Sequence, residues 1–108
     1  MQSHPYPPIA RKDIDWKLGM KDAERAQTVA AGTHVIFKWS GTHNVWLMPN
    51  EAAYDGCDFS QATELAPTSV NEYTYKASAA GTFYFGCEVT DHCAFGAIRL
   101  ALTVAAPR

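Results

Sequence analysis

The sequence predicts a single all-β domain, a sandwich or barrel of short strands. Two observations support this prediction. Several runs rich in β-branched and aromatic residues alternate between apolar and polar positions, and turn-forming residues separate these runs. With 108 residues, the chain is long enough to bury one hydrophobic core and too short for a second domain.

The first clear strand is expected at residues 33–39, where Val35, Phe37 and Trp39 share one face. His34 lies on the opposite face of this strand, so we expect it to be solvated rather than a ligand. Short helices are expected only in the stretches 21–27, 50–54 and 61–65. The further strands are expected at residues 43–48, 72–77, 82–86 and 97–104.

Composition excludes several broad classes of protein. A formal net charge of -2, a pI of about 6.0 and 47% hydrophobic residues favour an ordinary globular protein over a nucleic-acid binder or a disordered chain. No apolar run approaches the roughly 20 residues that span a bilayer, and the N-terminus lacks the apolar stretch of a signal peptide. We expect no nucleic-acid partner and no membrane span, with any targeting segment already removed. Residues 1–13 read as an extended lead-in, and residues 14–108 as the folded domain.

Three cysteines are present, Cys57, Cys87 and Cys93. An odd number in a small domain of extracellular type indicates one disulfide and one free thiol. The count alone does not decide which cysteine is free. A disulfide would place the protein in an oxidising compartment, either secreted or periplasm-like.

The densest group of metal-capable side chains follows the strand expected at residues 82–86. Cys87 and His92 lie on the loop that joins this strand to the next, and the distant His43 begins another strand. One thiolate and two imidazoles form the trigonal set that suits copper, because soft sulfur stabilises Cu(I) and imidazole serves both oxidation states. The sequence therefore predicts one copper per chain.

Three segments resemble the phytocyanins, which are plant-type blue copper proteins of the cupredoxin family. They are AGTHVIFKWSGTHNV before the first histidine, AAYDGCD, and FYFGCEVTDHCAFG in the loop. The resemblance runs from about residue 28 to residue 104 and implies a Greek-key β-sandwich with one or two short helices. It also implies that His43, Cys87 and His92 are the copper ligands and that Cys57 pairs with Cys93.

The chain departs from the family at one position. Phytocyanins commonly carry Met or Gln five residues after the loop histidine as a weak axial ligand, and Ala97 stands there. A methyl group cannot coordinate a metal. The copper is then three-coordinate, or it binds water or another small ligand, or a different residue replaces the missing one.

Two aromatic residues near the ligands have more than one interpretation. Phe95 lies between His92 and Ala97, where it would either cover the copper or, together with Trp46, form a docking surface. Glu88 and Asp91 would steer a basic partner or simply be solvated. Met48 is expected to pack in the core.

The predicted function is single-electron transfer by a non-enzymatic monomer, with a redox protein or a small electron donor or acceptor as partner. The solvent-facing edge of His92 is the expected route for the electron. Two alternatives stay open. One is copper storage, delivery or sensing at an open coordination position. The other is a metal-free adhesion or carbohydrate-binding module, although retention of all three strong ligands argues against it.

Overall fold

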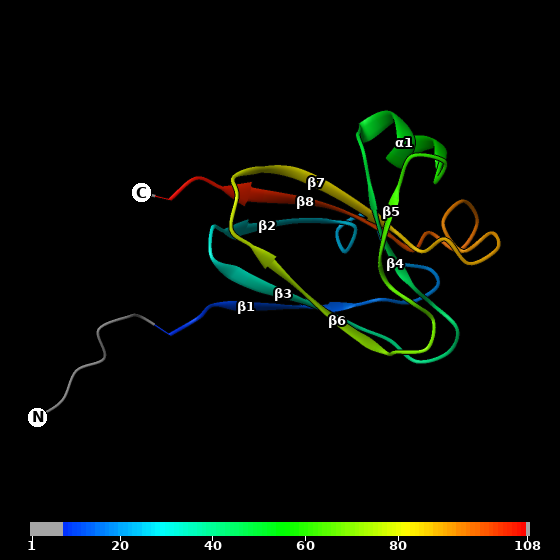
Figure 1. Cartoon of the computed structure of the whole chain (residues 1–108), viewed down its shortest axis with the longest axis horizontal. Coiled ribbons are helices and arrows are strands. Elements are labelled where there is room, and N and C mark those ends of the chain that lie inside the picture. Colours follow the sequence, from blue (N-terminus) through cyan, green and yellow to red (C-terminus); the bar gives the residue numbers. More distant parts are fainter. Residues whose placement is uncertain (1–7, 108) are drawn as a thin grey trace, which may run out of the picture.

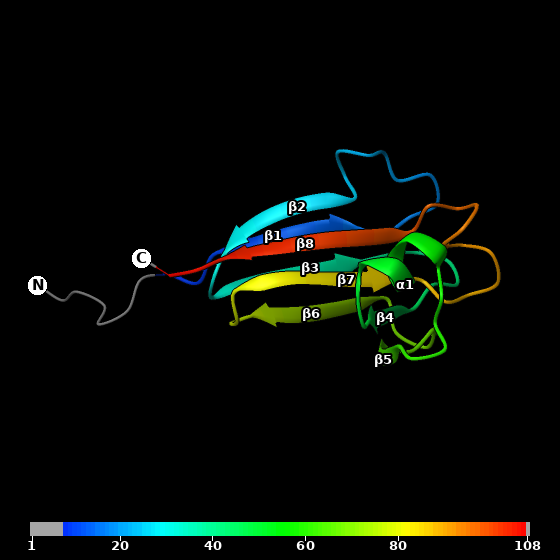
Figure 2. The ribbon, with the colours of Figure 1, turned by 90° about the horizontal axis from the view of Figure 1, so that it is seen from above.

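The computed structural model describes residues 8–107, which form a sandwich of two β-sheets with a short helix beside one end (Figures 1 and 2). This arrangement confirms the predicted fold class. The strands and the helix of the described residues have the following bounds: β1 Arg11–Asp15, β2 Ala26–Ala30, β3 Thr33–Lys38, β4 Val45–Met48, α1 Glu51–Gly56, β5 Thr63–Ala66, β6 Glu72–Ala77, β7 Gly81–Gly86 and β8 Arg99–Ala105.

The two sheets are unequal in size. One is three-stranded with the order β1-β3-β6, and the other is five-stranded with the order β2-β8-β7-β4-β5. Two strand pairs are parallel, β1 with β3 and β2 with β8. The other pairs are antiparallel. Neighbouring strands are therefore often distant in sequence. This is how the chain brings His43 beside the loop that follows β7.

The core lies between the sheets, where the inward faces of the strands meet. Val35 and Phe37 of β3 are completely buried, and Trp39 just beyond the strand is also buried, as the alternation predicted. The Phe37 ring packs at 5.0 Å from Trp16 and at 5.1 Å from Phe85. Such aromatic contacts add about 0.5–1.5 kcal/mol each beyond simple burial.

A second, smaller apolar cluster covers the outer face of the five-stranded sheet. The helix α1 begins at the cap residue Asn50, whose side chain accepts a hydrogen bond from the Ala53 N–H group. In the segment that follows the helix, Phe59 packs edge-on against Trp46. A Cβ atom on Gly86 would lie 2.9 Å from the Phe59 ring, so a larger residue there would require that ring to move.

The loops that carry the predicted ligands gather at one end of the sandwich. Figure 1 shows the loop between β7 and β8 and the connection between β1 and β2 at this end, while the C-terminal end of β8 points the opposite way. No helix of the described residues is long and apolar enough to cross a membrane.

Several expected boundaries were wrong. Residues 61–65 contribute to the edge strand β5, and residues 21–27 form turns followed by the start of β2, so neither stretch is a helix. Pairing with β4 and β8 overrides the weak helical preference of these residues. Residues 11–13 belong to β1, while residues 1–7 of the expected lead-in lie outside the described part. β8 begins at Arg99, because Ala97 adopts a left-handed backbone conformation with φ of 60°.

Candidate metal centre

The three predicted ligands meet in space. Nδ1 of His43 lies 3.1 Å from Nδ1 of His92, and Sγ of Cys87 lies 3.9 Å and 3.6 Å from these two nitrogens. A point in the plane of this triangle lies about 2.1 Å from all three atoms, which matches bonds of about 2.0–2.3 Å from a first-row metal such as zinc to imidazole and thiolate. His43, Cys87 and His92 would therefore be able to hold a first-row metal ion.

Each ligand is held by a different local feature. Cys87 directly follows β7, and its backbone N–H donates to the Ile98 carbonyl at 3.1 Å. Ile98 in turn donates to the His92 carbonyl at 3.0 Å, so the loop closes on itself. His43 directly precedes Asn44 and the strand β4. His43 and Cys87 are buried, while the His92 side chain is partly exposed.

Burial sets the protonation of two of the ligands. It raises the pKa of the Cys87 thiol, and the nearby negative charge of Glu88 acts in the same direction. Backbone N–H groups of Asn44 and Val89 oppose this shift, because they donate to the sulfur and favour the thiolate. Burial, together with the charge of His92, lowers the pKa of His43. A neutral His43 offers its Nδ1 lone pair, which is the form that binds a metal.

The family of the chain follows from comparison with known proteins. Residues 16–97 match the family described as the plastocyanin-like domain. The chain belongs to the plastocyanin-like family. Uclacyanin-2 of Arabidopsis thaliana is 32% identical over 96 residues, which cover 86% of this chain and 46% of that protein. The chain therefore spans about half the length of this relative.

Solved structures agree with this assignment. Cucumber stellacyanin, a structure with Cu²⁺, aligns with a TM-score of 0.74 and 21% identity, covering 94% of this chain and all of that one. Spinach plantacyanin aligns with a TM-score of 0.70 and 26% identity, covering 89% of this chain and all of that one. These matches place this plastocyanin-like domain among the phytocyanins, as the sequence resemblance indicated.

The plastocyanin-like domain contains the expected disulfide between Cys57 and Cys93. Among the described residues, Cys87 is the free cysteine. Cys93 directly follows the ligand His92, so the disulfide ties the ligand loop to the end of α1. Arg99 supports the same junction, because its guanidinium donates to the Tyr54 carbonyl at 2.8 Å at the end of the helix.

Two buried residues of the site were missed by the sequence analysis. Asn44 is 4% exposed, and its side-chain oxygen accepts a hydrogen bond from the Glu88 N–H group at 2.8 Å. Trp16 is 1% exposed, and its indole N–H donates to the Asn44 carbonyl at 2.9 Å. The available signal for Asn44 was a polar residue directly after a predicted ligand in an otherwise apolar run. The sequence offered no signal for the role of Trp16.

The other residues singled out near the ligands differ in their surroundings. Phe95 is 86% exposed, so it does not cover the metal centre. Trp46 is partly exposed, and Phe59 packs edge-on against its ring. Glu88 and Asp91 are exposed, and Ala97 is partly exposed. Met48 is buried, as expected, although it packs under α1 against Gly86 rather than between the sheets.

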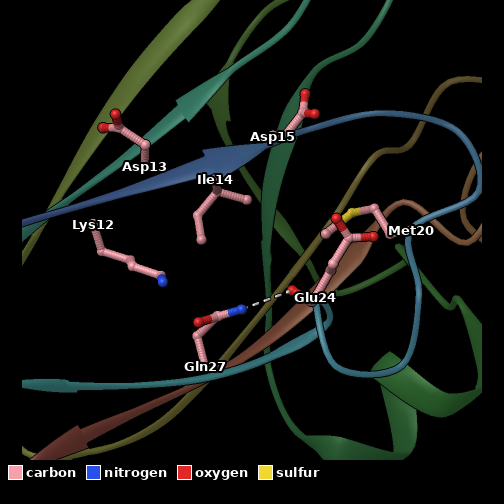
Figure 3. A pocket seen from close by; sticks show the side chains of 7 residues that line it. All are labelled: Lys12, Asp13, Ile14, Asp15, Met20, Glu24 and Gln27. Carbon is pink, nitrogen blue, oxygen red and sulfur yellow. Dashed lines mark hydrogen bonds between the residues drawn. The ribbon is translucent and has the colours of Figure 1, made fainter.

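A separate hollow of about 240 Å³ lies along the seam between β1 and β2 (Figure 3). Charged and polar side chains line most of it, and the buried Met20 also contributes. Among the described residues, the one group of three or more metal-capable side chains with converging ligand atoms is His43, Cys87 and His92. The metal chemistry of this domain is therefore assigned to the end of the sandwich, not to its seam.

Proposed function

We propose that this plastocyanin-like domain binds one copper ion through His43, Cys87 and His92 and carries single electrons. The observation that supports the proposal most directly is the donor triangle, with one thiolate sulfur and two imidazole nitrogens at the spacing a first-row metal requires. This donor set suits copper in both of its common oxidation states. A copper held there supplies a one-electron couple between Cu(II) and Cu(I).

The surroundings of the ligands favour electron transfer. The backbone of each ligand is hydrogen-bonded or adjoins a strand, and the disulfide fixes the loop next to His92. Ligands that move little when the metal changes charge keep the reorganisation small, which speeds electron transfer. His92 is more exposed than Cys87 and His43, so its outer edge is the proposed route for the electron.

The proposal extends to partner and location. The partner is a redox protein or a small electron donor or acceptor that contacts the end of the sandwich around His92. The disulfide fits a secreted protein in an oxidising compartment, because structural disulfides persist there and are rare in the cytosol.

Metal content and visible absorption of the purified protein test this function. We expect one copper per chain and an intense visible band in the oxidised protein. This band should disappear with a reductant and return with an oxidant. Absence of copper binding would instead favour a metal-free adhesion or carbohydrate-binding module. Copper that binds without reversible colour change would favour storage, delivery or sensing.

A further inference from the structure

The segment Trp16–Met20, which leaves β1 and crosses the metal end of the sandwich, contacts both parts of the chain that supply ligands. Figure 3 shows Asp15, which ends β1 just before the segment, and Met20, which ends the segment where the chain returns towards β2. Met20 is 3% exposed and belongs to the main core. The segment is therefore anchored at its far end by a buried side chain.

The first contact is with the His43 side of the centre. Trp16 is buried, and its indole N–H donates to the carbonyl of Asn44, the neighbour of His43. The Trp16 backbone N–H donates to the carbonyl of Lys38 at 2.9 Å, and the Trp16 ring packs edge-on against Phe37. The start of the segment is thus fixed against the core and against Asn44, the neighbour of the first ligand.

The second contact is with the ligand loop. The backbone N–H of Gly19 donates to the carbonyl of Gly96 at 2.6 Å. A Cβ atom on Gly96 would lie 2.6 Å from Cδ2 of Leu18 and 2.5 Å from the carbonyl oxygen of His92. The missing side chain at position 96 therefore allows Leu18 to lie directly against the turn between His92 and Ala97.

Leu18 adds an apolar side chain beside the turn that carries Ala97. Ala97 contributes a single methyl group next to Gly96, and Phe95 is too exposed to cover the site. Leu18 is 55% exposed, and its Cδ2 atom faces Gly96 in the ligand loop. Its methyl groups make entry unfavourable for an anion, because the anion would lose water without gaining a polar partner.

We propose that Leu18, held in place by the segment Trp16–Met20, excludes small anionic ligands from the metal on the Ala97 side. This inference rests on the proposed copper site. It identifies Leu18 as a specificity-determining residue, which lets the domain dispense with an axial side chain and still keep external ligands off the metal.

An azide titration of the copper-loaded protein, followed by visible absorption, tests this role. Azide is a small anion that changes the spectrum when it coordinates Cu(II). We expect wild type to respond weakly and Leu18→Ala to bind azide at least tenfold more tightly. Leu18→Ile should restore the wild-type response, because it keeps the apolar volume. Ile9→Ala removes a similarly exposed aliphatic side chain near the turn between β2 and β3 and should leave the response unchanged.

Three results would overturn the inference. Leu18→Ala could keep the wild-type copper spectrum and respond to azide like wild type. Wild type could itself bind azide as tightly as Leu18→Ala. Leu18→Ala could also lose copper altogether, which would show that the side chain holds the site together rather than excluding ligands. In each case a coloured wild-type protein would leave the proposed function standing, whereas a wild type without copper would refute that function first.

Discussion

Asn44 and Glu88 join the two segments that carry the buried metal ligands. The Asn44 side chain accepts a hydrogen bond from the Glu88 backbone N–H at 2.8 Å and donates to the Glu88 carboxylate at 3.2 Å. Asn44 follows His43 in the chain, and Glu88 follows Cys87. One buried amide thus holds two ligands side by side from segments more than forty residues apart.

Replacing this amide should weaken the fold and the site together. Asn44→Ala removes the acceptor of the Glu88 N–H group, so we expect the free energy of unfolding to fall by about 1–3 kcal/mol. Urea unfolding of the metal-free protein measures this loss. Asn71→Ala serves as the control, because Asn71 is exposed, and it should change the stability little. Equal stability of the two variants would contradict the role assigned to Asn44.

The thiolate of Cys87 should be the source of the visible colour. Cys87→Ser removes the sulfur and leaves both imidazoles in place, so the intense charge-transfer band from thiolate to Cu(II) should be lost. The variant is still expected to hold a pale, more weakly bound copper. Absorption spectra and metal analysis of copper-loaded wild type and variant make the comparison. An unchanged spectrum in the variant would refute the ligand assignment.

The disulfide between Cys57 and Cys93 should leave one thiol to titrate. Unfolded, metal-free protein that has not been reduced is expected to show a single reactive thiol, that of Cys87. The crosslink spans 36 residues, for which the loop-entropy description gives a stabilisation of about 3–4 kcal/mol. The double variant Cys57→Ala/Cys93→Ala should lose up to this amount in urea unfolding. Three reactive thiols in wild type would show that the bond is absent in solution.

The sequence predicted β3, β6 and β7 well, and the edge strands β1, β2 and β5 poorly. In β3 the alternation of apolar residues reflects one buried face, which is visible in the sequence. The edge strands β1 and β2 each bury a single apolar residue, Ile14 and Val29, so they give no comparable pattern. Their pairing with distant strands, and not their own composition, makes them strands.

The candidate metal ligands could be predicted because one thiolate and two imidazoles form a donor set that suits copper, and because the segments that carry them resemble those of phytocyanins. The residues that support them could not. The roles of Trp16 and Leu18 depend on contacts with residues far along the chain, at positions 44 and 96. For Phe95, an apolar residue beside a ligand suggested a cover as readily as a docking surface, and only its exposure in the folded chain excludes the first.

His43 should make the metal-free protein less stable in weak acid. Burial and the charge of His92 hold the pKa of His43 below its ordinary value of 6.5. Below that pH the unfolded chain binds more protons than the folded one, so stability falls as the pH falls. We expect the urea midpoint of the metal-free protein to decrease from about pH 7.5 to about pH 5.5.

The matched variant for this test is His43→Gln, which removes the titrating group. Its urea midpoint should change less over the same pH range. Asp13, Glu24 and Asp58 also have lowered pKa values, but they lose their contribution below about pH 4.5, outside the window of His43. An equal pH dependence in wild type and His43→Gln would refute the assignment to His43.

Substitutions at position 97 test the axial position, because other residues with a Cβ atom would adopt the same backbone conformation as Ala97. Its φ of 60° is a left-handed conformation that costs any residue with a Cβ atom about 1–2 kcal/mol. Methionine and leucine at position 97 would bear the same cost as alanine, so Ala97→Met and Ala97→Leu can be compared with wild type directly. Ala97→Gly should instead stabilise the protein by about 1 kcal/mol, because glycine adopts this conformation without that cost.

Restoring a thioether at position 97 should lower the reduction potential. Without an axial donor, the metal receives less electron density, which disfavours Cu(II) more than Cu(I) and keeps the potential high as long as water stays out. A methionine sulfur that favours Cu(II) tenfold would lower the potential of this one-electron couple by about 59 mV. Redox titration followed at the visible band measures the shift. Ala97→Leu fills the same space without a donor, so it should leave the potential at or above the wild-type value. A potential that rises in Ala97→Met would mean that water already occupies the wild-type position, because the thioether would then displace an oxygen ligand that stabilises Cu(II).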